Sequence, residues 1–129
     1  MNALRRETTG RIFLGGHSYG GRQASMLAAE EPDLAAALLF LSYPLHPPEK
    51  PANLRTEHFP SLRTPALFVS GDRDGFGTPK ELQAAVAIIP ARTHLMMVTS
   101  AGHELLNKKT QDDLPPRIVQ AFLGFIKQA

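Results

Sequence analysis

Cysteine is absent from this 129-residue chain, which excludes disulfides, thiolate metal sites and a cysteine nucleophile and fits a reducing cytoplasm. The chain has little net charge, with 14 Lys and Arg against 12 Asp and Glu. It also has no run of basic residues interleaved with aromatic ones. A nucleic-acid partner is therefore not expected. The longest apolar run, residues 34–41, is far shorter than the roughly 20 residues that span a bilayer. The start of the chain is unlike a secretory signal, so we expect a cytoplasmic protein that does not enter the membrane.

Short apolar runs alternate with helical patterns along the chain. Buried strands are predicted at residues 12–14, 36–41, 66–70 and 95–99, and helices at residues 18–31, 78–89 and 114–127. The middle helix has the clearest start, because Thr78, Pro79 and Glu81 give a capping box with proline at the first helical position. This alternation predicts one α/β domain over residues 1–129 with a parallel sheet. The linker at residues 43–64 holds five of the eleven prolines, and its length suggests a functional loop.

The strongest chemical signal follows the first predicted strand. Gly16, Ser18 and Gly20 form the pattern G-x-S-x-G between an apolar strand and a helix. In that setting the glycines permit a tight turn that exposes the serine Oγ, and the backbone N–H of Tyr19 at the helix start would stabilise an oxyanion. A phosphate-binding loop and a dinucleotide fingerprint fit poorly, because the Lys-Ser/Thr pair and the middle glycine are missing. A plain structural turn remains an alternative to Ser18 as nucleophile.

A serine nucleophile needs a histidine that takes its proton and an acid that orients the histidine. Asp72 and Asp74 follow the strand at residues 66–70, and His103 follows the strand at residues 95–99. The resulting order of serine, acid and histidine is that of α/β hydrolases, and both loops lie at the carboxyl ends of predicted strands. Asp74 is preferred to Asp72 because it stands three residues after the strand-ending glycine, although a D-x-D-G turn is also ordinary loop chemistry.

The remaining histidines are His17, His46, His58 and His94, which we expect to be structural or solvated. His46 follows a strand end and is also a candidate for the substrate pocket, together with Tyr43 and Phe76. No metal or cofactor is implied, because a Ser-His-Asp triad needs neither.

Three segments resemble a known family: GGHSYGGRQASMLAAEEP, YPLHPP and LFVSGDRDGFGTPKEL. They are similar to a small α/β-hydrolase family related to dienelactone hydrolases, mostly bacterial, with eukaryotic relatives that include a histone-acetyltransferase complex subunit. The resemblance covers nearly the whole chain. It implies a three-layer α/β-hydrolase fold, with Ser18 as nucleophile, Asp74 as acid and His103 as base.

The chain corresponds only to the C-terminal half of that fold, because about four strands normally precede the nucleophile strand and eleven residues precede Ile12 here. The first half normally supplies a second oxyanion N–H, and removing one such donor costs about 10²–10³ in rate. The strand at residues 12–14 would become a sheet edge, which favours a homodimer through that edge.

The leading functional hypothesis is a serine hydrolase that acts on a small-molecule ester, lactone or thioester. The alternatives are a non-catalytic interaction module with the same fold, or an inactive fragment of a longer hydrolase.

Overall fold

A computed structural model describes residues 12–127 apart from residues 51 and 53. Four strands form one fully parallel sheet, with neighbours in chain order: β1 (Phe13–His17), β2 (Ala37–Leu41), β3 (Ala66–Gly71) and β4 (Thr93–Val98). The helices are α1 (Tyr19–Glu30), η1 (Phe59–Ser61), α2 (Pro79–Val86) and α3 (Leu114–Lys127). Because all strands point the same way, every strand-end loop that carries a candidate residue emerges at one edge of the sheet.

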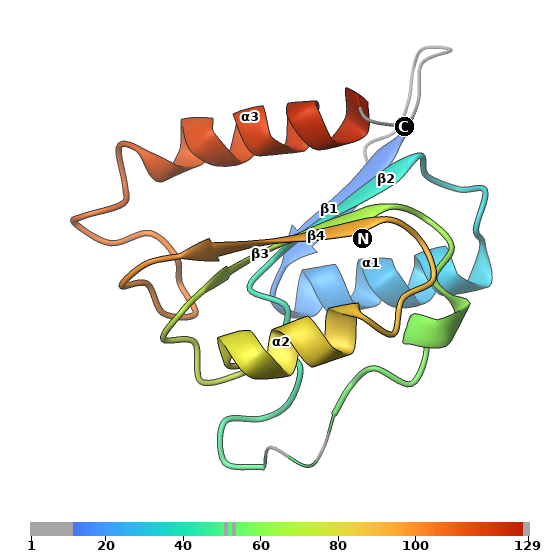
Figure 1. Ribbon diagram of the computed structural model, residues 1–129, viewed down its shortest axis with the longest axis horizontal. Coiled ribbons are helices and arrows are strands. Elements are labelled where there is room, and N and C mark those ends of the chain that lie inside the picture. The colour runs from blue at the N-terminus through green and yellow to red at the C-terminus, as the bar shows by residue number, and fades with distance from the viewer. Residues whose placement is uncertain (1–11, 51, 53, 128–129) are drawn as a thin grey trace.

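The helices cover both faces of the sheet (Figure 1). Helices α1 and α2 pack on one face and α3 packs on the other, each burying its apolar side. The result is a three-layer α/β architecture, which confirms the predicted fold class of about four parallel strands with flanking helices. The predicted capping box of α2 is present, with the Glu81 N–H donating to Thr78 Oγ1 and the Thr78 N–H donating to Glu81 Oε1.

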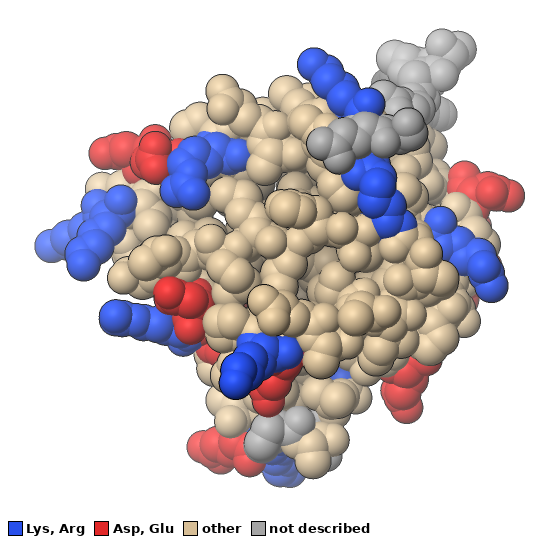
Figure 2. Space-filling view, viewed as in Figure 1, with Lys and Arg blue, Asp and Glu red and all other residues tan. Residues whose placement is uncertain are grey.

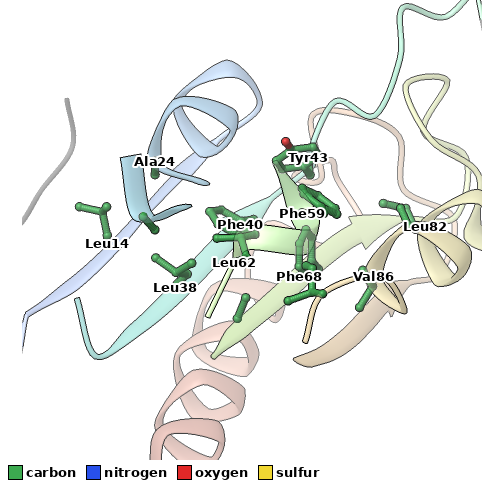
Figure 3. Packing of buried hydrophobic residues seen from close by; sticks show 14 of the residues in the cluster. Leu14, Ala24, Leu38, Phe40, Tyr43, Phe59, Leu62, Phe68, Leu82 and Val86 are labelled. Carbon is green, nitrogen blue, oxygen red and sulfur yellow. The ribbon is translucent and has the colours of Figure 1, made fainter. Parts of the chain in front are cut away.

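The larger core lies between the sheet and the layer of α1 and α2. Phe40, Phe59 and Phe68 are fully buried there (Figure 3), and the ring of Phe68 contacts those of Phe40 and Phe59. Each fully buried side chain of this size contributes about 1.5–3 kcal/mol relative to an exposed one. Phe59 belongs to the proline-rich linker, so part of that segment contributes to the core.

The opposite face has a smaller core under α3, in which Leu67 and Val69 of β3 meet Leu114 and Phe125. Within the described residues β1 is an edge strand, since it pairs only with β2. A homodimer through this edge stays a prediction. No described helix is both long and apolar enough to cross a membrane. Figure 2 shows acidic and basic side chains around the margin of one face, with uncharged surface between them.

Candidate active site

The turn between β1 and α1 holds Ser18 in an unusual backbone conformation. Its φ is 55° and its ψ is −121°, outside the regions that most non-glycine residues adopt. Such a conformation costs about 1–3 kcal/mol and persists only where the surroundings impose it. Two features do so here: the Ser18 N–H donates to Leu41 O at 2.8 Å, and a Cβ on Gly16 would lie 2.6 Å from the carbonyl carbon of Gly20. The strand and the helix start therefore approach so closely that residue 16 must be glycine.

A continuous chain of hydrogen bonds begins at this serine. Ser18 Oγ lies 2.8 Å from His103 Nε2, and His103 Nδ1 lies 2.9 Å from Asp74 Oδ2 and 3.1 Å from Asp74 Oδ1. The Asp74 carboxylate is almost fully buried, whereas the His103 ring is partly open to solvent. The structure thus brings together the three residues that the sequence nominated from three separate loops.

The loop after β3 supports Asp74 from two sides. Gly71 allows the close approach of the histidine loop, because a Cβ at this position would collide with Ala101 O. The Phe76 N–H donates to Asp74 Oδ1 at 2.8 Å, and the Phe76 ring stacks on His103 with the ring centroids 4.2 Å apart. Phe76, predicted as a pocket residue, is in the site and packs directly on the imidazole.

Asp72, the competing acid, has a different partner. Its Oδ1 accepts the backbone N–H of Ser100 at 2.9 Å and so ties the loop after β3 to the loop after β4. No hydrogen bond joins it to His103 within the described part of the chain. Its placement indicates a loop-bracing role.

Two further residues hold the histidine loop: Ser42, which the sequence argument did not identify, and His17, which it expected to be structural or solvated. Ser42 Oγ donates to the carbonyl oxygen of His103 at 2.7 Å, and His17 Nε2 lies 3.0 Å from the same oxygen. Ser42 directly follows β2 and has a φ of 56°. The signal that could have found it is its position, at the carboxyl end of the strand between β1 and β3.

The other candidate binding residues differ in exposure: Tyr19 is exposed, whereas Tyr43 and His46 are buried. Tyr19 is 52% exposed and begins α1, so its N–H has no partner within the helix. Tyr43 and His46 are 1% and 3% exposed. The Tyr43 hydroxyl donates to Arg55 O at 3.0 Å, and burial raises the pKa of Tyr43 to about 12. Contrary to the expectation that they line the pocket, both side chains face the interior.

His46 is instead the buried half of an ion pair with the partly exposed Glu81. Its Nδ1 donates to Pro47 O and its Nε2 lies 2.8 Å from Glu81 Oε1, the same oxygen that caps α2. Burial lowers the pKa of His46, but the hydrogen bonds to Glu81 and Pro47 raise it more, so the pKa lies above its usual value. The hydrogen bond from His46 in turn lowers the pKa of Glu81. The imidazolium and the carboxylate therefore stabilise each other.

A second serine–histidine pair lies inside the domain. Ser25 Oγ is 2.7 Å from His58 Nε2 but is fully buried and donates to Arg22 O. Burial, followed by the charge of Arg22, lowers the pKa of His58. No carboxylate is hydrogen-bonded to His58 in the described residues. Without access or an orienting acid, this pair has the character of an interior polar contact.

An apolar hollow of about 310 Å³ lies beside the histidine loop. Its walls are mainly Leu105, Leu106, Leu114 and Ile118, with His17 and Glu104 also contributing. Across residues 12–127, outside the two gaps, no group of three or more His, Asp or Glu side chains is arranged to hold a metal ion.

Comparison with known proteins identifies the family. Residues 1–127 match the family described as the alpha/beta hydrolase domain. The chain belongs to the alpha/beta hydrolase family. The sequence also resembles dienelactone hydrolases, and a dienelactone hydrolase is among the solved structures that this chain matches.

Three of those structures illustrate the similarity. A dienelactone hydrolase from Anabaena variabilis has 19% identity and a TM-score of 0.65, covering 92% of this chain and 49% of that one. A predicted CIB-like hydrolase from Thermoplasma acidophilum has 21% identity and a TM-score of 0.65, covering 92% and 52%. A serine hydrolase homologue from Coxiella burnetii has 20% identity and a TM-score of 0.57, covering 92% and 49%. This hydrolase domain therefore shares their fold and spans about half their length.

Proposed function

We propose that this alpha/beta hydrolase cleaves a small carboxylic ester, lactone or thioester through Ser18, His103 and Asp74. The observation that carries the proposal is the unbroken hydrogen-bond chain from Ser18 Oγ through both nitrogens of His103 to the buried carboxylate of Asp74. A serine hydroxyl becomes nucleophilic when a neighbouring base accepts its proton. Here the base is already at 2.8 Å from the hydroxyl.

In the first step, Ser18 Oγ forms a bond to the carbonyl carbon as His103 Nε2 takes the hydroxyl proton. Asp74 stabilises the resulting imidazolium through its hydrogen bond from Nδ1–H. Collapse of the tetrahedral intermediate breaks the bond to the leaving alcohol or thiol, which receives the proton from His103. Water then repeats the sequence on the acyl-serine, releasing the acid and restoring the serine hydroxyl.

The oxyanion of the intermediate forms next to the start of α1. The Tyr19 N–H has no partner within the helix, and the partial positive charge of the helix N-terminus adds to its effect. Each donor of this kind contributes about 10²–10³ in rate. The chains of the matched hydrolase structures from Coxiella burnetii and Anabaena variabilis are about twice as long as this one.

Covalent labelling with a fluorophosphonate tests the nucleophile, because this reagent phosphonylates an activated serine. We expect labelling of the parent protein at Ser18, shown by peptide mass spectrometry, and its loss in Ser18→Ala. Ser25→Ala is the matched control, since Ser25 also contacts a histidine but is fully buried. We expect Ser25→Ala to remain labelled.

Two results would count against the proposal. Folded parent protein, with a cooperative unfolding transition, that takes up no reagent would favour a non-catalytic interaction module. Labelling that survives in Ser18→Ala and disappears in Ser25→Ala would move the nucleophile to the interior pair.

A further inference from the structure

His46 contacts the segment after Asp74 through its backbone as well as through its ring. Its backbone N–H donates to Phe76 O at 3.2 Å, while its ring Nε2 lies 2.8 Å from Glu81 Oε1. The same Glu81 oxygen accepts the backbone N–H of Thr78, the N-cap of α2. One linker residue therefore acts on this segment at two points, directly at Phe76 and through Glu81 at Thr78.

The first of these points leads directly to the proposed triad. The Phe76 N–H donates to Asp74 Oδ1 at 2.8 Å, and the Phe76 ring stacks on His103 with the centroids 4.2 Å apart. The carbonyl oxygen that His46 contacts belongs to the same residue as this N–H and this ring. A shift of Phe76 therefore alters the hydrogen bond between Asp74 and His103 from both sides.

The linker lies along this segment and has a stiff backbone. A Cβ on Gly77 would lie 3.4 Å from Leu45 Cδ1, and a Cβ on Gly75 would lie 3.6 Å from Pro48 Cβ. Two prolines follow His46, and they fix their own φ angles and restrict the backbone of the residue before them. Movement of the His46 ring is therefore transmitted to its N–H, because the flanking backbone has little freedom to absorb it.

The His46 ring satisfies both of its partners only when it is protonated. Nδ1 and Nε2 each lie 2.8 Å from an oxygen, Pro47 O and Glu81 Oε1, and a carbonyl or carboxylate oxygen can only accept. A neutral imidazole has one N–H, so its other nitrogen would direct a lone pair at one of these oxygens. The side chain is 3% exposed, which leaves water little access to replace the lost hydrogen bond. Loss of the proton therefore releases one of the two contacts.

The groups that act on His46 come from the linker, from α2 and from the loop after β3. Burial lowers the pKa of His46, but the hydrogen bonds to Glu81 and Pro47 and the negative charges of Glu81 and Asp74 raise it more. The pKa therefore lies above its usual value of 6.5. The two ring contacts are complete below pH 6.5, and one of them is lost as the pH rises through the folded pKa.

We propose that His46 is a positioning residue for the triad: in its protonated form it fixes Phe76 and with it the carboxylate of Asp74. The reactivity of Ser18 then declines when His46 loses its proton, although His46 does not touch the serine or the substrate. This inference rests on the proposed function, because it concerns the acid of the proposed triad.

The first test is the pH dependence of fluorophosphonate labelling in the parent protein. We expect the rate constant to rise as the triad base loses its proton and to fall again at higher pH as His46 loses its own. The fall should be about 10- to 100-fold, since misplacing a catalytic group by about 1 Å costs up to about 100-fold. A parent rate constant that reaches a plateau with no alkaline fall would overturn the inference.

Two substitutions separate positioning from a general structural role. His46→Gln keeps an N–H donor for Glu81 but cannot titrate, so the alkaline fall should disappear while the rate at about pH 6.5 stays within about tenfold of the parent. Glu81→Gln keeps an oxygen for the Thr78 N–H but removes the negative charge beside His46, so the fall should move to lower pH. A loss of rate that is equal at every pH in both variants would indicate a structural role alone and overturn the inference.

His94→Gln is the matched control for the loss of one imidazole. His94 is exposed near the amino end of β4, whereas Ser18 follows the carboxyl end of β1 in the same parallel sheet. We expect its pH profile to equal that of the parent. An alkaline fall that disappears in His94→Gln as it does in His46→Gln would overturn the inference.

A nuclear magnetic resonance measurement separates this inference from the proposed function. In Ser18→Ala protein, which lacks the proposed nucleophile, the amide proton of Phe76 reports its hydrogen bond to Asp74. We expect this proton to shift upfield as the His46 ring loses its proton, and to lose that component when His46→Gln is added. This result supports the coupling even if the parent protein takes up no label. Labelling of Ser18 in the parent, with a Phe76 resonance that does not respond to His46, would leave the hydrolase standing and overturn the inference.

Discussion

Asp74→Asn is the substitution that tests the site most directly, because asparagine has the same shape and differs only in hydrogen bonding. Asp74 Oδ1 accepts the Phe76 N–H at 2.8 Å. The amide oxygen of the new side chain must take this position, since an NH₂ group there would face another donor. The NH₂ group then occupies the position of Oδ2, 2.9 Å from His103 Nδ1.

The consequence reaches the nucleophile through the imidazole ring. Nδ1 now accepts a hydrogen bond from the amide, so the single proton of the neutral ring moves to Nε2. At 2.8 Å from Ser18 Oγ, Nε2 then donates to the hydroxyl and can no longer take its proton. In triads of this type the wrong tautomer lowers kcat by about 10⁴, equivalent to about 5 kcal/mol of transition-state stabilisation.

The assay is the rate constant for fluorophosphonate labelling, together with hydrolysis of a p-nitrophenyl ester. Asp72→Asn is the control, because it removes the same charge from the same loop and its amide oxygen can still accept the Ser100 N–H. We expect Asp72→Asn to stay within about tenfold of the parent rate, well short of the loss expected for the triad acid. A folded Asp74→Asn protein that keeps more than about a tenth of the parent rate would refute the tautomer argument, as would an equal loss in Asp72→Asn.

Two other predictions concern the turn and the ion pair of His46 with Glu81. Gly16→Ala should abolish labelling and destabilise the domain, measured by urea unfolding, because its Cβ would lie 2.6 Å from backbone at the start of α1; a stable, labelled variant would show that the turn can relax. His46→Gln should lower the unfolding free energy by about 1–2 kcal/mol at about pH 5.5, where His46 and Glu81 are both charged. The folded state raises the pKa of His46, so its contribution to the unfolding free energy is complete below the usual value of 6.5 and is lost as pH rises through the folded pKa. The folded state lowers the pKa of Glu81, so its contribution to the unfolding free energy is complete above 4.5 and is lost as pH falls through the folded pKa. The difference between His46→Gln and the parent should therefore shrink by about pH 8.5, and a difference that grows with pH would contradict the assignment of an ion pair.

Local signals in the sequence predicted the four strands and the three α-helices, but not the short helix η1 in the linker. The helix predicted from Thr78 starts as expected, because capping depends on residues within one turn of each other. The first strand is longer than the apolar run that predicted it, since β1 continues through two glycines to His17. Glycine gives no apolar signal, so hydrophobic periodicity underestimates a strand that ends in a turn of this kind.

Long-range packing explains the residues that the sequence placed wrongly. Tyr43 and His46 lie in a linker rich in proline, where polar residues are usually solvated, yet both point inward to partners that are distant in the chain. Ser42 was missed for the same reason, because its contact with the carbonyl oxygen of His103 spans 61 positions. Such contacts depend on how loops fold over the sheet, which no local pattern encodes.

The order of the strands connects the proposed nucleophile to the whole sheet. Ser18 follows β1, whereas its two partners follow β3 and β4, and Ser42, directly after β2, holds the histidine loop. Under the proposed mechanism, activation of Ser18 therefore requires all four strands to be paired at once. The labelling rate of Ser18 therefore reports on whether the sheet unfolds cooperatively. In a denaturant titration, labelling and the circular dichroism signal should be lost at the same midpoint if the sheet unfolds as one unit.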